Sequence, residues 1–247
     1  MIHALKSEWI KLHTARSNVV LLILALTVPL AITVLLTATI PIDDLGGENL
    51  FDLVLVGAGI GYILLGVLGV LLIGQEYRHT TIRVTFTADP HRVRVMAAKA
   101  IVIVATGLVI GAVVTGISYA FGNAVLTSRG LDITQDGGTQ TEALVGSTLL
   151  FALYGLIGLG VGAIIRAPAG AITFLVVWPI VVENIISAFF PAVGRWLPFT
   201  AGIQLISTSE TVDATEAMSP RAGGLWFAVV GLAVVAIGSL RVARSDA

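Results

Sequence analysis

Few side chains in this chain of 247 residues have the type and spacing that catalysis needs. The four histidines, His3, His13, His79 and His91, all lie outside its long apolar stretches. No Ser–His pair is therefore available inside those stretches, and the histidine spacing does not match a metal site. The chain has no cysteine, which removes thiolate nucleophiles, disulfides and cysteine-ligated metals. We expect neither a catalytic residue nor a bound metal.

Hydrolysis of ATP at a P-loop is excluded by the lysines. A P-loop needs Gly-Lys followed by Ser or Thr, because that lysine reaches the β- and γ-phosphates of the nucleotide. The only lysines, Lys6, Lys11 and Lys99, each follow an apolar residue. The chain therefore has no ATPase site of this kind, and we expect it not to be an enzyme by itself.

Positive charge is concentrated in residues 74–99, which we call the basic segment. It holds five of the fourteen Lys and Arg residues, namely Arg78, Arg83, Arg92, Arg94 and Lys99. Arginine can form forked hydrogen bonds with carboxylates of a partner protein, which predicts a docking surface. The alternative is that these charges only fix the topology of the chain in a membrane.

Glu183 is a second candidate, since it lies within an apolar stretch beside Asn184. Burying its charge in a membrane costs about 2 to 3 kcal/mol unless it is protonated, paired or facing water. Glu183 either contributes to a substrate pathway, reaches the outer headgroups, or is satisfied by Asn184 or a neighbouring helix. Pro179 leaves the carbonyl of Leu175 without its helical partner, which predicts a kink close to Glu183.

The composition indicates an integral membrane protein. Hydrophobic residues make up 56% of the chain, charged residues only 12%, and the mean hydropathy is +0.97. A spanning helix needs about 20 mostly apolar residues. Six stretches qualify: 19–40, 50–73, 98–122, 143–165, 169–190 and 222–240. We expect a single all-α transmembrane domain over residues 1–247, with Arg166-Ala-Pro168 as the tight turn between spans four and five.

The distribution of Lys and Arg predicts the orientation. Eleven of them fall on the side of the N-terminus, and three fall on the other side: Arg129, Arg195 and Arg221. Both termini are therefore expected in the cytoplasm, in a multi-pass protein of the cytoplasmic membrane. A cleaved signal peptide is the competing interpretation, but the polar lead before the first span is long for one.

Two segments outside the spans, one before the first span and one between spans five and six, mix apolar and polar residues. Within residues 1–18, Leu5, Trp9 and Leu12 recur at helical spacing, which predicts an interfacial amphipathic helix or, equally, a plain topology signal. Residues 191–221 begin with apolar and aromatic residues and then turn polar. The first half is expected to be partly re-entrant and to cap the bundle, or else to lie on the surface as an aromatic anchor formed by Trp196 and Phe199.

Glycines recur at spacings that allow helices to approach closely. They predict a packed bundle and possible subunit contacts, and they carry no information about a reaction. The pairs and the one longer series are Gly57 and Gly61, Gly107 and Gly111, Gly158 and Gly162, and Gly224 with Gly231 and Gly238.

This layout resembles the membrane subunit of type-2 ABC exporters. The specific part is the run Gln-Glu-Tyr-Arg-His-Thr-Thr-Ile-Arg at 75–83, with Asp-Pro-His-Arg at 89–92 and Lys99 following; a Trp-Leu-Pro stretch lies in the external segment. In that family the glutamate is commonly followed by Gly-Thr, whereas this chain has Thr80-Thr81. The missing glycine affects the tight exit from the second span, although either threonine could N-cap a following helix.

The resemblance implies that the basic segment forms a coupling helix seated on a separate ATPase subunit. Two such ATPases would bind ATP and Mg²⁺ and drive two membrane subunits, as a homodimer or heterodimer, between inward-facing and outward-facing states. By position, the coupling residues would be Glu76, Tyr77, Arg78, Thr81, Arg83, Pro90 and Arg92, and the pathway residues Glu183 and Asn184.

The expected activity is export of a hydrophobic or amphipathic substrate from a bacterium, in contact with membrane lipid and without a nucleic-acid partner or a cofactor bound by this chain. Two alternatives stay open. A secondary transporter would need internal repeats and paired ionisable residues, of which only Glu183 is evident. A non-transport membrane partner or sensor is the other.

Overall fold

The computed structural model describes residues 1–41, 50–82, 87, 91–131, 137–207 and 218–244, and these residues form helices and short connections without strands. The long helices are α1 (Ile2–Thr14), α2 (Arg16–Thr39), α3 (Leu50–Arg78), α5 (Arg92–Ser128), α6 (Gly137–Ile165), α7 (Pro168–Val177) and α11 (Pro220–Arg244). Shorter ones are the π-helix η2 (Trp178–Glu183), α8 (Asn184–Phe189), α9 (Pro191–Gly194), α10 (Pro198–Ile203) and the 3₁₀ turn η3 (Gln204–Ile206).

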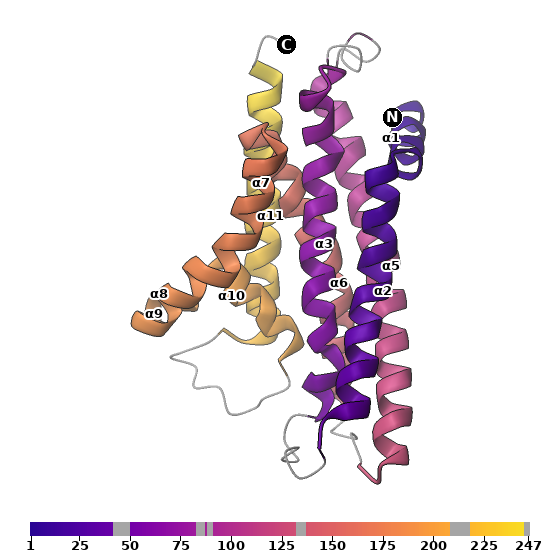
Figure 1. Ribbon diagram of the computed structural model, residues 1–247. Helices are drawn as coiled ribbons and strands as arrows, with labels where there is room; N and C mark the ends of the chain where they lie inside the picture. Colours follow the sequence, from indigo (N-terminus) through magenta and orange to yellow (C-terminus); the bar gives the residue numbers. More distant parts are fainter. Residues whose placement is uncertain (42–49, 83–86, 88–90, 132–136, 208–217, 245–247) are drawn as a thin grey trace.

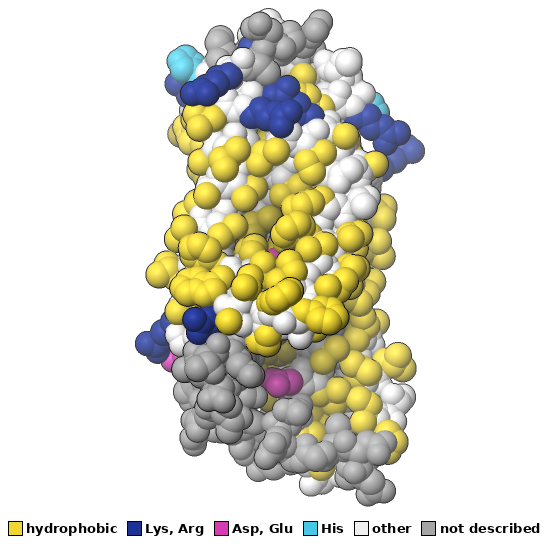
Figure 2. Space-filling view, turned by 90° about the vertical axis from the view of Figure 1, so that its left-hand side faces the viewer, with side chains coloured by type: hydrophobic (Ala, Val, Ile, Leu, Met, Phe, Trp, Pro, Cys, Tyr) yellow, Lys and Arg dark blue, Asp and Glu magenta, His cyan; other side chains and the backbone are white. Residues whose placement is uncertain are grey.

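The prediction of six spans is confirmed. Six helical stretches are long and apolar enough to cross a membrane: Arg16–Thr39, Leu50–Arg78, Arg92–Ser128, Gln140–Ile165, Pro168–Phe189 and Pro220–Arg244. Each one contains or closely matches a predicted stretch. Figure 2 shows the corresponding surface, with a broad band of hydrophobic side chains between Lys and Arg side chains above and below it.

Two of the spans form the centre of the bundle. In the most apolar 18-residue stretch of each span, 72% of the residues are buried in α6 and 61% in α3, whereas only 11% are buried in the fifth span, from α7 to α8. Figure 1 shows α3 and α6 flanked by α2 and α5 on one side and by α7 and α11 on the other, with both termini at the same end of the bundle. We refer to it as the terminal end.

The predicted glycine pairs lie where helices touch. A Cβ at Gly158 would collide with the carbonyl oxygen of Gly66, and a Cβ at Gly57 would collide with that of Pro29. Gly107 faces the backbone of Ala152 in the same way. Because lipid gives helices no hydrophobic reason to associate, this close approach contributes packing that larger side chains would prevent.

Hydroxyl groups add hydrogen bonds between the central spans. The Tyr62 hydroxyl lies 2.8 Å from Ser147 Oγ, and Thr115 Oγ1 lies 2.9 Å from the same atom. All three side chains are buried, so each hydrogen bond satisfies groups that would otherwise be unpaired in an apolar environment. The core is therefore held by packing and by a small number of neutral polar contacts.

The short helix α1 precedes the first span and lies beside α5 at the terminal end. Ala15 has an extended backbone (φ −74°, ψ 118°), which separates α1 from α2. Leu12 is fully buried and Leu5 packs on the core, while Trp9 is 50% exposed. The predicted N-terminal helix is therefore present, and it packs on the bundle through the face that carries the two leucines.

Candidate functional site

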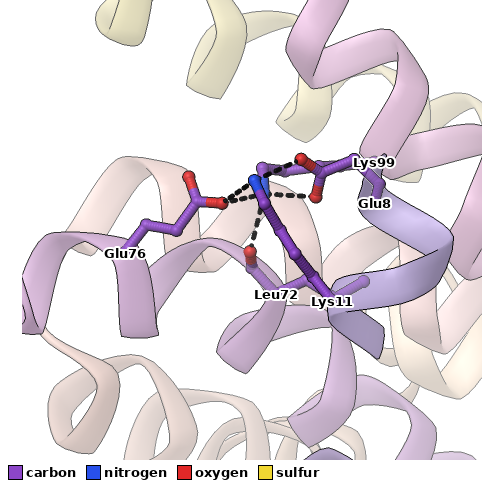
Figure 3. Close-up of polar contacts among 5 residues, drawn as sticks. All are labelled: Glu8, Lys11, Leu72, Glu76 and Lys99. Carbon is purple, nitrogen blue, oxygen red and sulfur yellow. Dashed lines mark hydrogen bonds and ion pairs between the residues drawn. The ribbon is translucent and has the colours of Figure 1, made fainter. Parts of the chain in front are cut away.

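Four charged side chains meet at the terminal end, and we call them the charge cluster: Glu8, Lys11, Glu76 and Lys99. Lys99 is its centre and is 1% exposed. Its Nζ donates to Glu8 Oε2 at 2.6 Å, to Glu76 Oε1 at 2.7 Å and to the carbonyl oxygen of Leu72 at 2.9 Å (Figure 3). All three protons of the ammonium group are therefore used.

Lys11 completes the cluster from the side of α1. Its Nζ donates to Glu8 Oε1 at 2.7 Å and to Glu76 Oε1 at 2.8 Å. Burial favours the neutral amine of Lys11, but the carboxylates of Glu76 and Glu8 outweigh this effect and raise its pKa. Lys11 therefore stays charged at neutral pH, and the formal charges of the two lysines balance those of the two glutamates.

Helical geometry explains why these side chains converge. Glu8 and Lys11 are three residues apart on α1, and Leu72 and Glu76 are four apart on α3, so each pair lies on one helix face. Lys99 lies in the second turn of α5 and points between them (Figure 3). The cluster therefore joins α1, the end of α3 and the start of α5.

Burial makes it costly in free energy to leave any charge of this junction unpaired. Charges removed from water cost several kcal/mol each, and the cost is offset only when every charge has a partner with good geometry. Glu8 is 2% exposed and Glu76 is 7% exposed. Any movement of α1 or α5 that separates Lys99 from its partners would leave an uncompensated buried charge, so the three helix ends are locked together.

Two arginines attach α11 to the same end. Arg92 Nη1 donates to the carbonyl oxygen of Val242 at 3.1 Å, and Arg166 Nη2 donates to that of Arg241 at 2.9 Å. Basic side chains commonly satisfy the last carbonyls of a helix in this way. The Arg166 guanidinium also lies 5.3 Å from the centre of the Tyr77 ring. The turn between spans four and five therefore bridges the ends of α3 and α11.

The predicted coupling residues are distributed over this region. Glu76 is buried in the cluster, Tyr77 is half-buried, Arg92 is half-buried against α11, and Arg78 and Thr81 are exposed. Arg83 and Pro90 lie outside the described residues. Among the coupling residues that the structure describes, Arg78 and Thr81 are the exposed ones, while Glu76 is engaged inside the protein.

Thr80 has a backbone conformation that glycine normally supplies. Its φ is +55°, in the left-handed region, directly after α3 ends at Arg78. This is the position at which the resemblance would place glycine, because a residue without Cβ adopts that conformation without steric cost. The backbone therefore makes a left-handed turn directly after α3, at a threonine rather than a glycine.

The sequence alone does not reveal the part that Glu8 and Lys99 play in the cluster. The patterns above predict no role for Glu8, and they predict Lys99 only as one of the charges of the basic segment. A signal did exist, because Glu8 is three residues after Leu5 and four before Leu12, on the buried face. Lys99 also lies at the second position of the predicted span 98–122.

Glu183 has a complete set of partners and is 1% exposed. Its carboxylate accepts hydrogen bonds from the Trp178 indole at 2.9 Å and from the backbone N–H and hydroxyl of Thr200 at 2.7 and 2.9 Å. The backbone N–H of Phe199 lies at 3.3 Å from it. Thr200 and Phe199 belong to the first turn of α10, so Glu183 caps that helix from a neighbouring span.

The helix of the fifth span is irregular around Pro179, as the sequence predicts. The α-helical pattern gives way to the π-helix η2 between α7 and α8. Asn184 Nδ2 donates to the carbonyl oxygens of Pro179 and Ile180 at 3.1 and 2.9 Å, which satisfies carbonyls near the disruption. Both predicted pathway residues therefore have structural partners, and their place in a pathway stays a prediction.

The fold and the charge cluster define a multi-pass α-helical membrane protein in which buried ion pairs fasten the N-terminal helix to two spans. No protein-family model matches this chain, and a search of curated proteins finds no match. The functional assignment therefore depends on the residues and the geometry described above.

Replacing Lys99 tests the energetic role of the charge cluster. Lys99→Met leaves Glu8 and Glu76 buried with one ammonium instead of two, so we expect the unfolding free energy to fall by about 3–5 kcal/mol. Thermal unfolding in detergent measures this. Lys6→Met, at an exposed position of α1, is the matched control and should change little. Equal stability of both variants would contradict a structural role for the cluster.

Replacing Glu183 tests whether its carboxylate supports α10. Glu183→Gln removes the charge that accepts the four hydrogen bonds, and we expect a loss of about 1–3 kcal/mol in unfolding free energy. The matched control is Glu142→Gln, whose ion pair with Arg221 is exposed and should contribute less than about 1 kcal/mol. Wild-type stability of Glu183→Gln would rule out the capping role.

Proposed function

We propose that this chain is the membrane subunit of an ATP-driven exporter of the type-2 ABC class, coupled to a separate ATPase subunit. The basic segment, which begins at the end of α3 and ends in α5, is the proposed docking element. The observation that carries the proposal is the charge cluster, because it joins these two helices to each other and to α1. A displacement of the basic segment would therefore move α1, α3 and α5 together.

Rigid attachment matters for such a mechanism. Transmission of a movement over a distance requires packed elements that shift as units rather than a loop that absorbs the displacement. Lys99 ties α5 to α3 through Glu76 and Leu72, and Arg92 ties the start of α5 to the end of α11. The basic segment is thus attached at both of its ends to rigid parts of the bundle.

The backbone at Thr80 adds support to the resemblance. Its left-handed φ reproduces the turn for which the family commonly has glycine. Further support comes from the charge distribution, because the helix ends at the terminal end carry most of the Lys and Arg residues. We assign the terminal end to the cytoplasm, where an ATPase would meet Arg78 and Thr81.

The remaining elements receive roles in the same proposal. We assign α1 to the cytoplasmic membrane interface, with Trp9 exposed toward the headgroups. α10 packs on α11 and contributes Phe199 to a buried aromatic group with Tyr154 and Phe227. We assign the stretch from α9 to η3 to a partly re-entrant cap on the external side, held by Glu183.

The complete transporter in this proposal contains two membrane subunits and two ATPases that bind ATP and Mg²⁺. It works by alternating access in the cytoplasmic membrane of a bacterium. The substrate class is hydrophobic or amphipathic. Since Glu183 is fully hydrogen-bonded to α10 and Trp178, it offers no added support for an ion-coupled secondary transporter.

The proposal is tested by co-expressing the chain with the P-loop ATPase encoded beside it and purifying the complex. We expect Arg78→Ala to weaken ATPase binding about tenfold, because an exposed arginine at a docking surface contributes roughly 1–2 kcal/mol. Stimulation of ATP hydrolysis by the membrane subunit should fall in parallel. Arg221→Ala is the matched control, since Arg221 is exposed at the start of α11, far from the terminal end.

Two results would contradict the proposal. One is the absence of any stable complex with a P-loop ATPase. The other is an ATPase affinity that Arg78→Ala leaves unchanged, or lowers no more than Arg221→Ala does, which would reduce the arginines of the basic segment to topology signals.

A further inference from the structure

A cavity of about 360 Å³ lies toward the end of the bundle opposite the terminal end, between the first turns of α3 and the stretch from α10 to Ser207. On the side of α3 it is lined by Asp52, Leu55, Val56 and Gly59. These residues are three, one and three positions apart, so they lie on one face of the helix. The cavity therefore meets a single face of α3, which is charged where the helix begins and apolar further along.

The space exists because the fifth span leaves α3 before it reaches this end. Near the terminal end α7 packs closely on α3, where Gly66 lies against Leu175 and Gly74 lies against Pro168. Figure 1 shows that α8 and α9 then lean away from α3. A Cβ at Gly59 would meet open space. The cavity is therefore a real gap beside α3 and not a shallow furrow between packed side chains.

The opposite wall is held in place by close packing. Leu205, in the middle of this wall, packs on α6 and α11, because a Cβ at Gly146 would collide with its carbonyl oxygen and a Cβ at Gly224 with its side chain. A ligand would therefore meet a wall whose position is already set, which lowers the entropy cost of binding. Two apolar and two polar residues of this wall line the cavity: Ile203, Ile206, Gln204 and Ser207.

The polar groups of the cavity suit a cation. Asp52 is half-buried, and Gln204 and Ser207 add an amide oxygen and a hydroxyl oxygen as further acceptors. No Lys, Arg or His is among the described residues that line the cavity. Asp52 has another interaction within the protein, but a carboxylate offers about four acceptor positions and can accept from a ligand as well. A protonated amine, which only donates, matches this set of groups.

The apolar side chains of the cavity suit a hydrocarbon chain on the same ligand. Val56 is 53% exposed and Ile203 is 38% exposed, so both have surface that a ligand could cover. Ile63 is half-buried and follows Asp52 by about three helical turns, which places it on the same face of α3. A chain attached to an amine at Asp52 can therefore run over Gly59 toward Ile63 without changing the face of the helix.

The charge of the surrounding sequence also favours a cation. Three segments join the spans on the side opposite the terminal end: 40–52, 129–142 and 195–221. Together they contain ten Asp and Glu residues against three Arg, with no Lys or His. An excess of one sign of charge raises the local concentration of ions of the opposite sign. A cationic ligand is therefore attracted to this end, and an anionic one is repelled.

We propose that this cavity binds an amphiphile with a protonated amine, of which a long-chain alkylammonium ion is the simplest example. The ammonium group donates to Asp52, and the hydrocarbon chain covers Val56 and Gly59. A phospholipid fits less well, because its phosphate would face the carboxylate without a basic side chain from the lining. Binding needs only the arrangement of α3, α10 and η3, so the inference does not depend on the proposed function.

A single cysteine in the cavity can report its occupancy, because the chain has no native cysteine. In lipid nanodiscs without an ATPase, decylammonium should slow the reaction of Val56→Cys with N-ethylmaleimide. The concentration required should be about tenfold lower than that of decanol, which has the same chain without the charge. Val145→Cys, equally exposed on α6, is the matched control, and decylammonium should leave its reaction rate unchanged.

Three substitutions in the Val56→Cys chain complete the test. Asp52→Asn should remove the difference between decylammonium and decanol, whereas Glu142→Gln, which removes an exposed carboxylate on α6, should keep it. Gly59→Leu places a side chain in the open space and should abolish protection, even if Asp52→Asn fails to fold.

Four results would overturn the proposal. They are equal protection by decylammonium and decanol, equal effects of Asp52→Asn and Glu142→Gln, full protection in Gly59→Leu, and slowing of Val145→Cys to the same extent as Val56→Cys. Decyltrimethylammonium has the same charge and no N–H donor, so stronger protection by this compound would overturn the assignment to a protonated amine.

Discussion

A buried ammonium group with three protein acceptors is the interaction on which the terminal end of this bundle depends. Lys99 is 1% exposed and bonds to Glu8 on α1 and to Glu76 and Leu72 on α3. The charges must stay together because separation would leave one of them without compensation in a low-dielectric environment. That constraint joins three helix ends into one unit, and this unit includes both ends of the basic segment proposed to receive the ATPase.

On the opposite side of the molecule from the terminal end, a buried carboxylate caps a short helix. Glu183 reaches from the irregular part of the fifth span to the first turn of α10, where its carboxylate replaces missing helical acceptors. Between the two ends, glycines and hydroxyl groups hold the central spans at close range. Charged side chains thus fix the ends of the bundle, while neutral packing forms its middle, where a charge would be costly.

The sequence predicts the spans well because hydropathy and helix length are local properties. The six stretches, the turn at Arg166 and the disruption at Pro179 all follow from neighbouring residues. The partners of the charged groups do not. Glu8 and Lys99 are separated by 91 residues, and their contact depends on how α1 docks. Glu183 was singled out by its cost in a membrane, but its partner helix α10 came from a segment without helical periodicity.

The distance between α1 and the start of α5 tests the central claim most directly. The chain has no native cysteine, so spin labels can be placed at Ile10→Cys and Val93→Cys, both exposed positions, without other changes. In lipid nanodiscs we predict a narrow distance distribution, which becomes longer and broader when Lys99→Met is added. An identical narrow distribution with and without Lys99 would contradict the claim that the charge cluster holds these helix ends together.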